Sequence, residues 1–124
     1  MHLLSVREWL LPAGRDPADI VSVGLQECVK LTASAVIGEG GGETKGEGRY
    51  WEETVCALFG VPNEYTVLVS KQYVGLYHLL LAKTPLVEKG VVRGARSLCA
   101  GCGFMGLMGN KGAVSASVAV YNDR

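Results

Sequence analysis

The sequence predicts an α/β protein of the α+β sandwich type, in which a mixed sheet of mostly antiparallel strands is flanked by helices. Two stretches have the apolar spacing of amphipathic helices, and five have the composition of strands. The last four strand-like stretches follow one another without a long helical pattern between them. Consecutive strands joined by short turns pair antiparallel, whereas parallel strands need long crossover connections. This order therefore favours antiparallel pairing.

The first helix is predicted over residues 5–11. Ser5 is a good N-terminal cap, and Pro12 ends the helix because it cannot continue the backbone hydrogen-bond ladder. Trp9 and Leu10 are expected to face the core.

The first strand is predicted over residues 19–27, where a nearly continuous apolar run suits a strand covered on both faces. The run stops at Gln26 and Glu27. Because ligand sites of α/β sheets gather at the carboxyl ends of strands, Glu27 is a candidate metal ligand or base. The alternative is a solvated carboxylate at the start of a helix, where the helix dipole favours it.

Residues 29–37 fit either a helix or an extended segment. Residues 38–48 are dominated by glycine and predict a flexible surface insert. The second helix is predicted over residues 50–59, with Trp51, Val55, Leu58 and Phe59 on one face, and Gly60 with Pro62 ends it.

Four strands are then predicted, over residues 65–74, 76–82, 91–98 and 113–121. Gly75 is either a tight turn or a bulge between the first two. Thr84 and Pro85 mark a break. The last strand carries no charged residue, which natural sheets avoid at an open edge, so we expect the domain to continue beyond it.

The glycine-rich stretch GFMGLMGNKGAV occupies residues 103–114. Successive backbone N–H groups in such a loop can hold an anion, and Lys111 adds a point charge suited to phosphate. The loop also carries four large apolar side chains, Phe104, Met105, Leu107 and Met108. A glycine-rich hairpin with a solvated lysine is the alternative.

Two better-known glycine motifs are excluded by context. Residues 101–106 match GxGxxG, but a strand-like run follows where the dinucleotide fingerprint needs a helix. A Walker A loop needs a hydroxyl residue after its lysine, and here Gly112 follows Lys111.

Composition narrows the class of protein. The 124 residues suit a single domain, and 48% of them are hydrophobic, too many for a disordered tail. Lysine plus arginine and aspartate plus glutamate number 12 each, so bulk nucleic-acid binding is not expected. No apolar run reaches the roughly 20 residues of a membrane span, and the start lacks the pattern of a signal peptide.

The cysteines predict reduced, structural thiols rather than a metal or redox centre. Cys99 and Cys102 form a lone CxxC, with Cys28 and Cys56 elsewhere in the chain. A zinc site needs a second ligand pair, and a redox motif should open a helix. His78 lies in a strand-like run and is expected to be a satisfied side chain.

With these motifs in view, the chain resembles the inositol polyphosphate 5-phosphatases of the endonuclease/exonuclease/phosphatase superfamily. The resemblance rests on SVREWLL, PADIVSVGLQE, YWEETVCALFG, LVSKQYVGLYHLLLAK and GFMGLMGNKGAVSASVAVYN. LQE is shared across the superfamily, whereas GNKGAV following VGLY is more specific to the inositide enzymes.

The resemblance implies roles for particular residues. Glu27 corresponds to the metal-binding carboxylate, with Mg²⁺ as the ion. Asn110 and Lys111 correspond to the segment that meets a substrate phosphate. The four apolar residues of the loop lie where the family is expected to contact lipid or the membrane surface.

The same resemblance implies that residues 1–124 are the N-terminal portion of a catalytic domain. Segments that carry the general acid/base histidine and the Gly-Asp-Leu-Asn, Cys-Asp-Arg and Ser-Asp-His motifs are not among them. We therefore expect the isolated chain to be inactive, because such residues work as a unit. The expected partners are a phosphoinositide or inositol phosphate and a peripheral membrane surface, at a cytoplasmic location. A non-catalytic phosphoinositide-binding remnant and a related Mg²⁺-dependent phosphodiesterase or nuclease are the alternatives.

Overall fold

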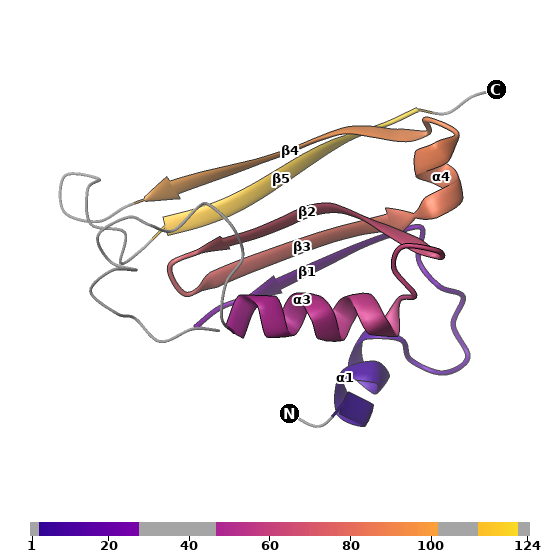
Figure 1. Cartoon of the computed structure of the whole chain (residues 1–124), viewed down its shortest axis with the longest axis horizontal. Helices are drawn as coiled ribbons and strands as arrows, with labels where there is room; N and C mark the ends of the chain where they lie inside the picture. The colour runs from indigo at the N-terminus through magenta and orange to yellow at the C-terminus, as the bar shows by residue number, and fades with distance from the viewer. Residues whose placement is uncertain (1–2, 28–46, 102–111, 122–124) are drawn as a thin grey trace.

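The computed structural model describes residues 3–27, 47–101 and 112–121, and it arranges them in three layers (Figure 1). Two helices form one outer layer, a three-stranded sheet forms the middle, and a two-stranded sheet forms the other outer layer. The elements in chain order are α1 (Leu3–Leu10), β1 (Ile20–Leu25), α3 (Glu47–Leu58), β2 (Tyr65–Tyr73), β3 (Leu76–Lys83), α4 (Thr84–Glu88), β4 (Val92–Gly101) and β5 (Gly112–Val120).

Every strand pair in the described part of the chain is antiparallel, which confirms the predicted fold class. The middle sheet has the order β1-β3-β2, and the second sheet is the β4–β5 pair. Val74 and Gly75 form the turn between β2 and β3, so the turn alternative holds at Gly75. The irregularity of that sheet lies instead between Val67 and Val69 on β2.

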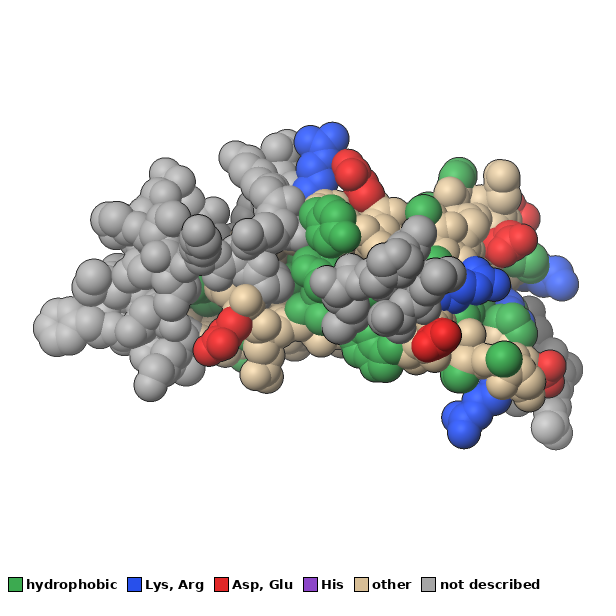
Figure 2. All heavy atoms as spheres, turned by 90° about the horizontal axis from the view of Figure 1, so that it is seen from below, with side chains coloured by type: hydrophobic (Ala, Val, Ile, Leu, Met, Phe, Trp, Pro, Cys, Tyr) green, Lys and Arg blue, Asp and Glu red, His purple; other side chains and the backbone are tan. Residues whose placement is uncertain are grey.

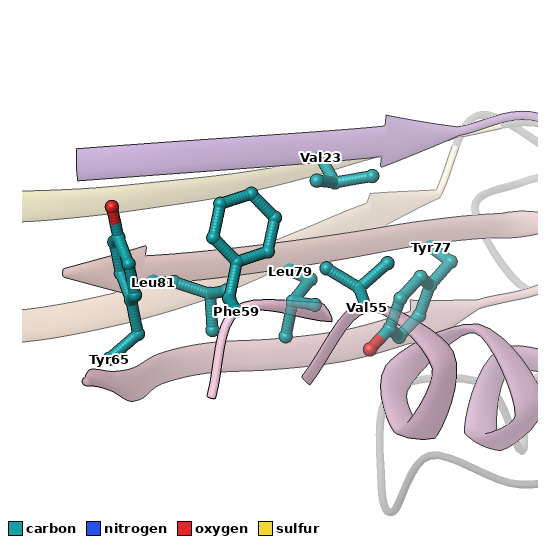
Figure 3. Packing of buried hydrophobic residues seen from close by; sticks show 7 residues of the cluster. All are labelled: Val23, Val55, Phe59, Tyr65, Tyr77, Leu79 and Leu81. Carbon is teal, nitrogen blue, oxygen red and sulfur yellow. The ribbon is translucent and has the colours of Figure 1, made fainter. Parts of the chain in front are cut away.

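The hydrophobic core lies between α3 and the middle sheet (Figure 3). Alternate residues of β3 point into it, and the rings of Phe59 and Tyr65 meet edge to face with centroids 5.1 Å apart. Burying each large side chain stabilises the fold by roughly 1.5–3 kcal/mol. The cluster consists of Val23, Val55, Phe59, Tyr65, Tyr77, Leu79 and Leu81.

The first helix differs from its prediction in two ways. It begins at Leu3, two residues before the expected cap, so Ser5 lies inside the helix. Trp9 is 54% exposed rather than in the core. An eight-residue helix presents one narrow stripe to its neighbours, and here Val6 and Leu10, four residues apart, occupy it.

Strand β1 is covered on one face rather than on two. Val23 is buried against the helices, whereas Ser22 and Gly24 on the opposite face are exposed. The expectation was wrong for the described residues because the β4–β5 sheet packs over β2 and β3 and leaves β1 uncovered. The apolar run therefore overstated how much of this strand is buried.

The two remaining helices also depart from expectation. Helix α3 begins at Glu47, so Glu47 and Gly48 belong to it rather than to the glycine-rich insert. The break at Thr84 and Pro85 starts the short helix α4, which was not predicted, and proline is well tolerated in a first helical turn. Residues 29–37, and the insert up to residue 46, lie outside the described residues.

The helix-covered face carries both signs of charge (Figure 2). Acidic and basic side chains are scattered there around a central band of hydrophobic ones, without a large patch of one sign. None of the described helices is long and apolar enough to cross a membrane.

Candidate functional site

The candidate site lies where five strand ends meet at one end of the molecule. Strands β1, β2 and β4 finish there, and β3 and β5 begin there (Figure 1). The pairing register aligns the ends within each sheet, because Leu25 pairs with Tyr77, Tyr73 with Leu76, and Gly101 with Gly112. Gln26, after the end of β1, and Gly112, at the start of β5, line the same hollow although they are far apart in the sequence.

A hollow of about 410 Å³ opens between these strand ends. Its wall on the middle sheet comes from β1 and β3, and its opposite wall comes from the start of β5. The lining residues are Gly24, Leu25, Gln26, Leu76, Tyr77, His78, Gly112, Ala113 and Val114. Because glycines form part of both walls, backbone rather than side chains shapes much of the entrance.

Glu27 comes directly after Gln26 of the hollow's lining and is exposed. Its backbone has a φ of 51°, the left-handed region that residues other than glycine seldom adopt. Such a conformation costs of order 1–3 kcal/mol and clusters at functional sites. Residues 26 and 27 form a bend, so Glu27 lies directly after the carboxyl end of β1, and its role as a metal ligand stays a prediction.

Gly112 marks the point where the glycine-rich loop returns to the sheet. A Cβ placed on Gly112 would stand 2.7 Å from Cε1 of Tyr73 and would also collide with the carbonyl oxygen of Ala100. Any larger residue would therefore push β5 away from β2 and β4. The glycine thus lets the start of β5 lie close to Tyr73 and Ala100.

The loop residues singled out by the sequence lie outside the described part of the chain. This applies to Asn110 and Lys111, predicted to meet phosphate, and to the apolar residues 104, 105, 107 and 108. Their two flanking residues, Gly101 and Gly112, are described and lie at the end of the sheet where Glu27 follows β1. Cys28 and Cys102 are also outside, while Cys56 and Cys99 are half-buried free thiols, as expected for reduced cysteines.

His78 also lines the hollow, although no functional role was predicted for it from the sequence. Its Nε2 lies 2.8 Å from Oγ of Ser22, so it has a hydrogen-bond partner as expected, while its Nδ1 is buried without one. Burial lowers the pKa of His78 from its ordinary value of 6.5, because a desolvated imidazolium is unfavourable. His78 lies directly opposite Gly24 in the pairing of β1 with β3, and no local sequence pattern signals this.

The described residues offer a metal ion few protein ligands. They contain no group of three or more His, Cys, Asp or Glu side chains able to hold a metal. Mg²⁺ prefers oxygen ligands, commonly takes one or two carboxylates and keeps several waters, so a single exposed carboxylate at a strand end fits it. Glu27 is the carboxylate that the sequence predicts for this role.

Similarity to known proteins identifies the family of this chain. The profile of Endonuclease/Exonuclease/phosphatase family 2 matches residues 1–124. The chain therefore belongs to the Endonuclease/Exonuclease/phosphatase family 2.

Its relatives include inositol polyphosphate 5-phosphatases. The chain is 30% identical to Type IV inositol polyphosphate 5-phosphatase 9 of Arabidopsis thaliana, an alignment covering 92% of this chain and 31% of that enzyme. It is also 30% identical to polyphosphatidylinositol phosphatase INP53 of Saccharomyces cerevisiae, covering 90% of this chain and 10% of that protein. The chain thus spans about a third or less of these relatives.

A solved structure supports the same assignment. The inositol polyphosphate 5-phosphatase domain of SPsynaptojanin, determined with inositol (1,4)-bisphosphate and a calcium ion, matches with a TM-score of 0.66 and 26% identity. The match covers 91% of this chain and 30% of that domain's chain. The resemblance to inositol polyphosphate 5-phosphatases drawn from the sequence is therefore confirmed.

Proposed function

We propose that this chain is the N-terminal part of a Mg²⁺-dependent phosphatase that removes the 5-phosphate from phosphoinositides or inositol polyphosphates. The observation that carries the proposal is the meeting of Gln26, at the end of β1, and Gly112, at the return of the glycine-rich loop, in one hollow. The strand end that leads to Glu27 and the strand start that follows the loop thus lie at one edge. The relatives, named for inositol phosphate or phosphoinositide substrates, support this assignment.

Four residues have roles in this function: Glu27, Asn110, Lys111 and Gly112. Glu27 would hold the ion, which when bound would neutralise phosphate charge and stabilise the charge that develops during hydrolysis. The backbone N–H groups of the loop, with Asn110 and Lys111, hold a substrate phosphate. Glycine at position 112 lets the strand after that loop start close to Tyr73 and Ala100.

The apolar side chains of the loop extend the proposal to the membrane. Phe104, Met105, Leu107 and Met108 would contact the acyl region or interface of a bilayer that carries the phosphoinositide. This gives four large apolar residues on a glycine-rich loop a reason to be there. It also makes the protein peripheral to membranes on their cytoplasmic side.

Metal binding by the chain tests the first role. Mn²⁺, a paramagnetic stand-in for Mg²⁺, should bind the wild-type chain and should bind Glu27→Gln at least tenfold more weakly. Glu88→Gln is the matched control, because Glu88 is an exposed carboxylate on α4, next to the other end of β3. Equal losses in both variants, or none in Glu27→Gln, would refute the metal role.

Lipid binding tests the second role. Vesicles containing phosphatidylinositol 4,5-bisphosphate should retain the wild-type chain better than vesicles of phosphatidylcholine. Lys111→Ala should lose most of this preference, whereas Lys89→Ala, an exposed lysine after α4, should keep it. Parallel loss in both variants would indicate nonspecific charge attraction.

Turnover separates an enzyme fragment from its alternatives. We propose that residues 1–124 release phosphate from phosphatidylinositol 4,5-bisphosphate at the background rate, since one candidate metal ligand cannot replace a constellation that works as a unit. A clear rate that Glu27→Gln abolishes would overturn this inactivity. Hydrolysis of DNA or RNA by the chain would favour the nuclease alternative.

A further inference from the structure

A polar pair joins β1 to β3 on the sheet face that points away from the helices. His78 on β3 is directly opposite Gly24 on β1, and its Nε2 reaches diagonally to Oγ of Ser22 at 2.8 Å. The absence of a side chain at Gly24 leaves open space beside the imidazole. The pair is thus a side-chain link between an edge strand and the centre of its sheet, and Ser22 lies three residues before the end of β1.

The surroundings of His78 favour the neutral imidazole with its hydrogen on Nε2. In that tautomer Nε2 donates to Ser22, and the buried Nδ1 is an unprotonated acceptor. Protonation would put a second hydrogen on Nδ1, and a buried donor without an acceptor is costly. The imidazolium therefore fits this position worse than the neutral ring.

The charged groups that face His78 do not compensate for protonation. Lys71 on β2 is the direct cross-strand partner of His78 and is a cation. Tyr73, two residues after Lys71, is a diagonal neighbour of His78 and pairs with Leu76. On β1 its neighbours are Ser22 and Gly24, and across the hollow β5 contributes Gly112, Ala113 and Val114, none of them acidic. Within the described residues, no carboxylate faces the ring from these strands.

We propose that His78 is an acid-sensitive latch: neutral, it ties β1 to β3 through Ser22, and protonated, it carries a buried Nδ1 hydrogen without an acceptor, a cost that is relieved when the end of β1 that leads to Glu27 opens. Among the described strands β1 pairs with β3 along one edge only, whereas β2 is joined to β3 by a two-residue turn. The edge strand is therefore the element that separates first. Its release would dismantle the wall of the hollow contributed by Gly24, Leu25 and Gln26.

The direction of the pH dependence follows from burial. The folded-state pKa of His78 is lowered from 6.5, so the unfolded or released state binds the proton more readily. The stability that neutral His78 contributes is fully present above pH 6.5 and decreases as pH falls below that value. The latch consequently goes beyond the proposed phosphatase function and needs neither metal nor substrate.

Hydrogen exchange on the complete chain tests the latch. Protection of the β1 amides, corrected for intrinsic exchange rates, should fall between pH 7.5 and pH 5, while protection of the β2–β3 hairpin persists. His78→Leu should abolish this selective loss. His2→Gln is the matched control, since His2 is the other histidine of the chain, and it should behave like the wild type.

Several results would overturn the proposal. They are a selective β1 loss that persists in His78→Leu, no loss in the wild type, and equal loss of protection throughout the sheet. If His78→Leu does not fold, Ser22→Ala replaces it: β1 should then be less protected at neutral pH with a weakened pH dependence. Ser117→Ala, on the exposed face of β5, should leave both unchanged. Because these measurements contain no metal ion, failure of the latch is distinguishable from failure of Glu27 as a ligand.

Discussion

The ring of Tyr73, at the end of β2, lies so close to Gly112, at the start of β5, that a Cβ added to Gly112 would stand 2.7 Å from Cε1 of the ring. This contact joins the middle sheet to the second sheet beside the hollow. The closeness depends on glycine because the carbonyl oxygen of Ala100 on the paired strand restricts the other side.

Gly112→Ala should therefore destabilise the fold by about 1–3 kcal/mol, the usual cost of overpacking. Gly24→Ala is the matched control, because Gly24 is also a strand glycine of the hollow but has nothing within 4 Å of an added Cβ. It should change stability by no more than ~0.5 kcal/mol. Urea unfolding of both variants measures the difference, and equal effects would contradict the Tyr73 contact.

Leu79→Ala should destabilise the protein by roughly 2–5 kcal/mol, because it leaves a cavity in the cluster between α3 and the middle sheet. Leu98→Ala makes the same chemical change on β4, where the side chain is 68% exposed, and should have an effect within about 0.5 kcal/mol. Thermal unfolding of the pair checks this. Similar losses would mean that the cluster is not the core of the isolated chain.

Tyr65→Phe should weaken the junction between β2 and the segment before β1. The Tyr65 hydroxyl donates to the carbonyl of Ala18 at 2.5 Å, and losing such a bond costs about 0.5–1.5 kcal/mol. Unfolding at neutral pH measures this loss. Tyr50→Phe serves as control because Tyr50 is 56% exposed. A cost no larger than that of Tyr50→Phe would contradict the role of the bond.

The alkaline stability of the chain should depend on the same residue. Burial, the largest cause, raises the pKa of Tyr65 above 10.0; Asp19 and Glu64 raise it further, and Lys83 opposes them. Stability from the neutral phenol is therefore fully present below pH 10 and lost as pH rises beyond it. Unfolding curves from pH 8 to pH 11 should show a decline that is smaller in Tyr65→Phe. An identical decline in both proteins would refute the assignment.

Cys56 should react slowly with iodoacetamide, since the thiolate is the nucleophile. Burial raises the pKa of its thiol, and the carboxylate of Glu52 raises it further. Glu52→Gln should speed alkylation of Cys56, measured by peptide mass spectrometry under native conditions. Glu53→Gln, the adjacent exposed carboxylate of α3, should not. Equal acceleration in both would show that local opening rather than charge controls the reaction.

The order and type of the strands could be predicted because alternating or continuous apolar residues and their turn residues are local signals. Residues 65–74, 76–82 and 113–121 were placed to within one residue of β2, β3 and β5. Predictions of burial were less accurate, because burial depends on which residues meet in the folded protein. Trp9 was assigned to the core although Val6 and Leu10 take the buried stripe, and β1 was expected to be covered on both faces.

The sequence by itself determined the antiparallel α/β class, Glu27 at the end of the first strand and the glycine-rich loop as the two candidate functional segments, because these features are written in consecutive residues. Only the tertiary structure brought the described ends of these segments, Gln26 and Gly112, to one hollow. Register between β1 and β3, and the close approach of Gly112 to Tyr73, arise from pairing and packing of residues far apart in the chain. The link between Ser22 and His78 has the same origin, since it joins positions 56 residues apart across a shared sheet face that neither local pattern specifies.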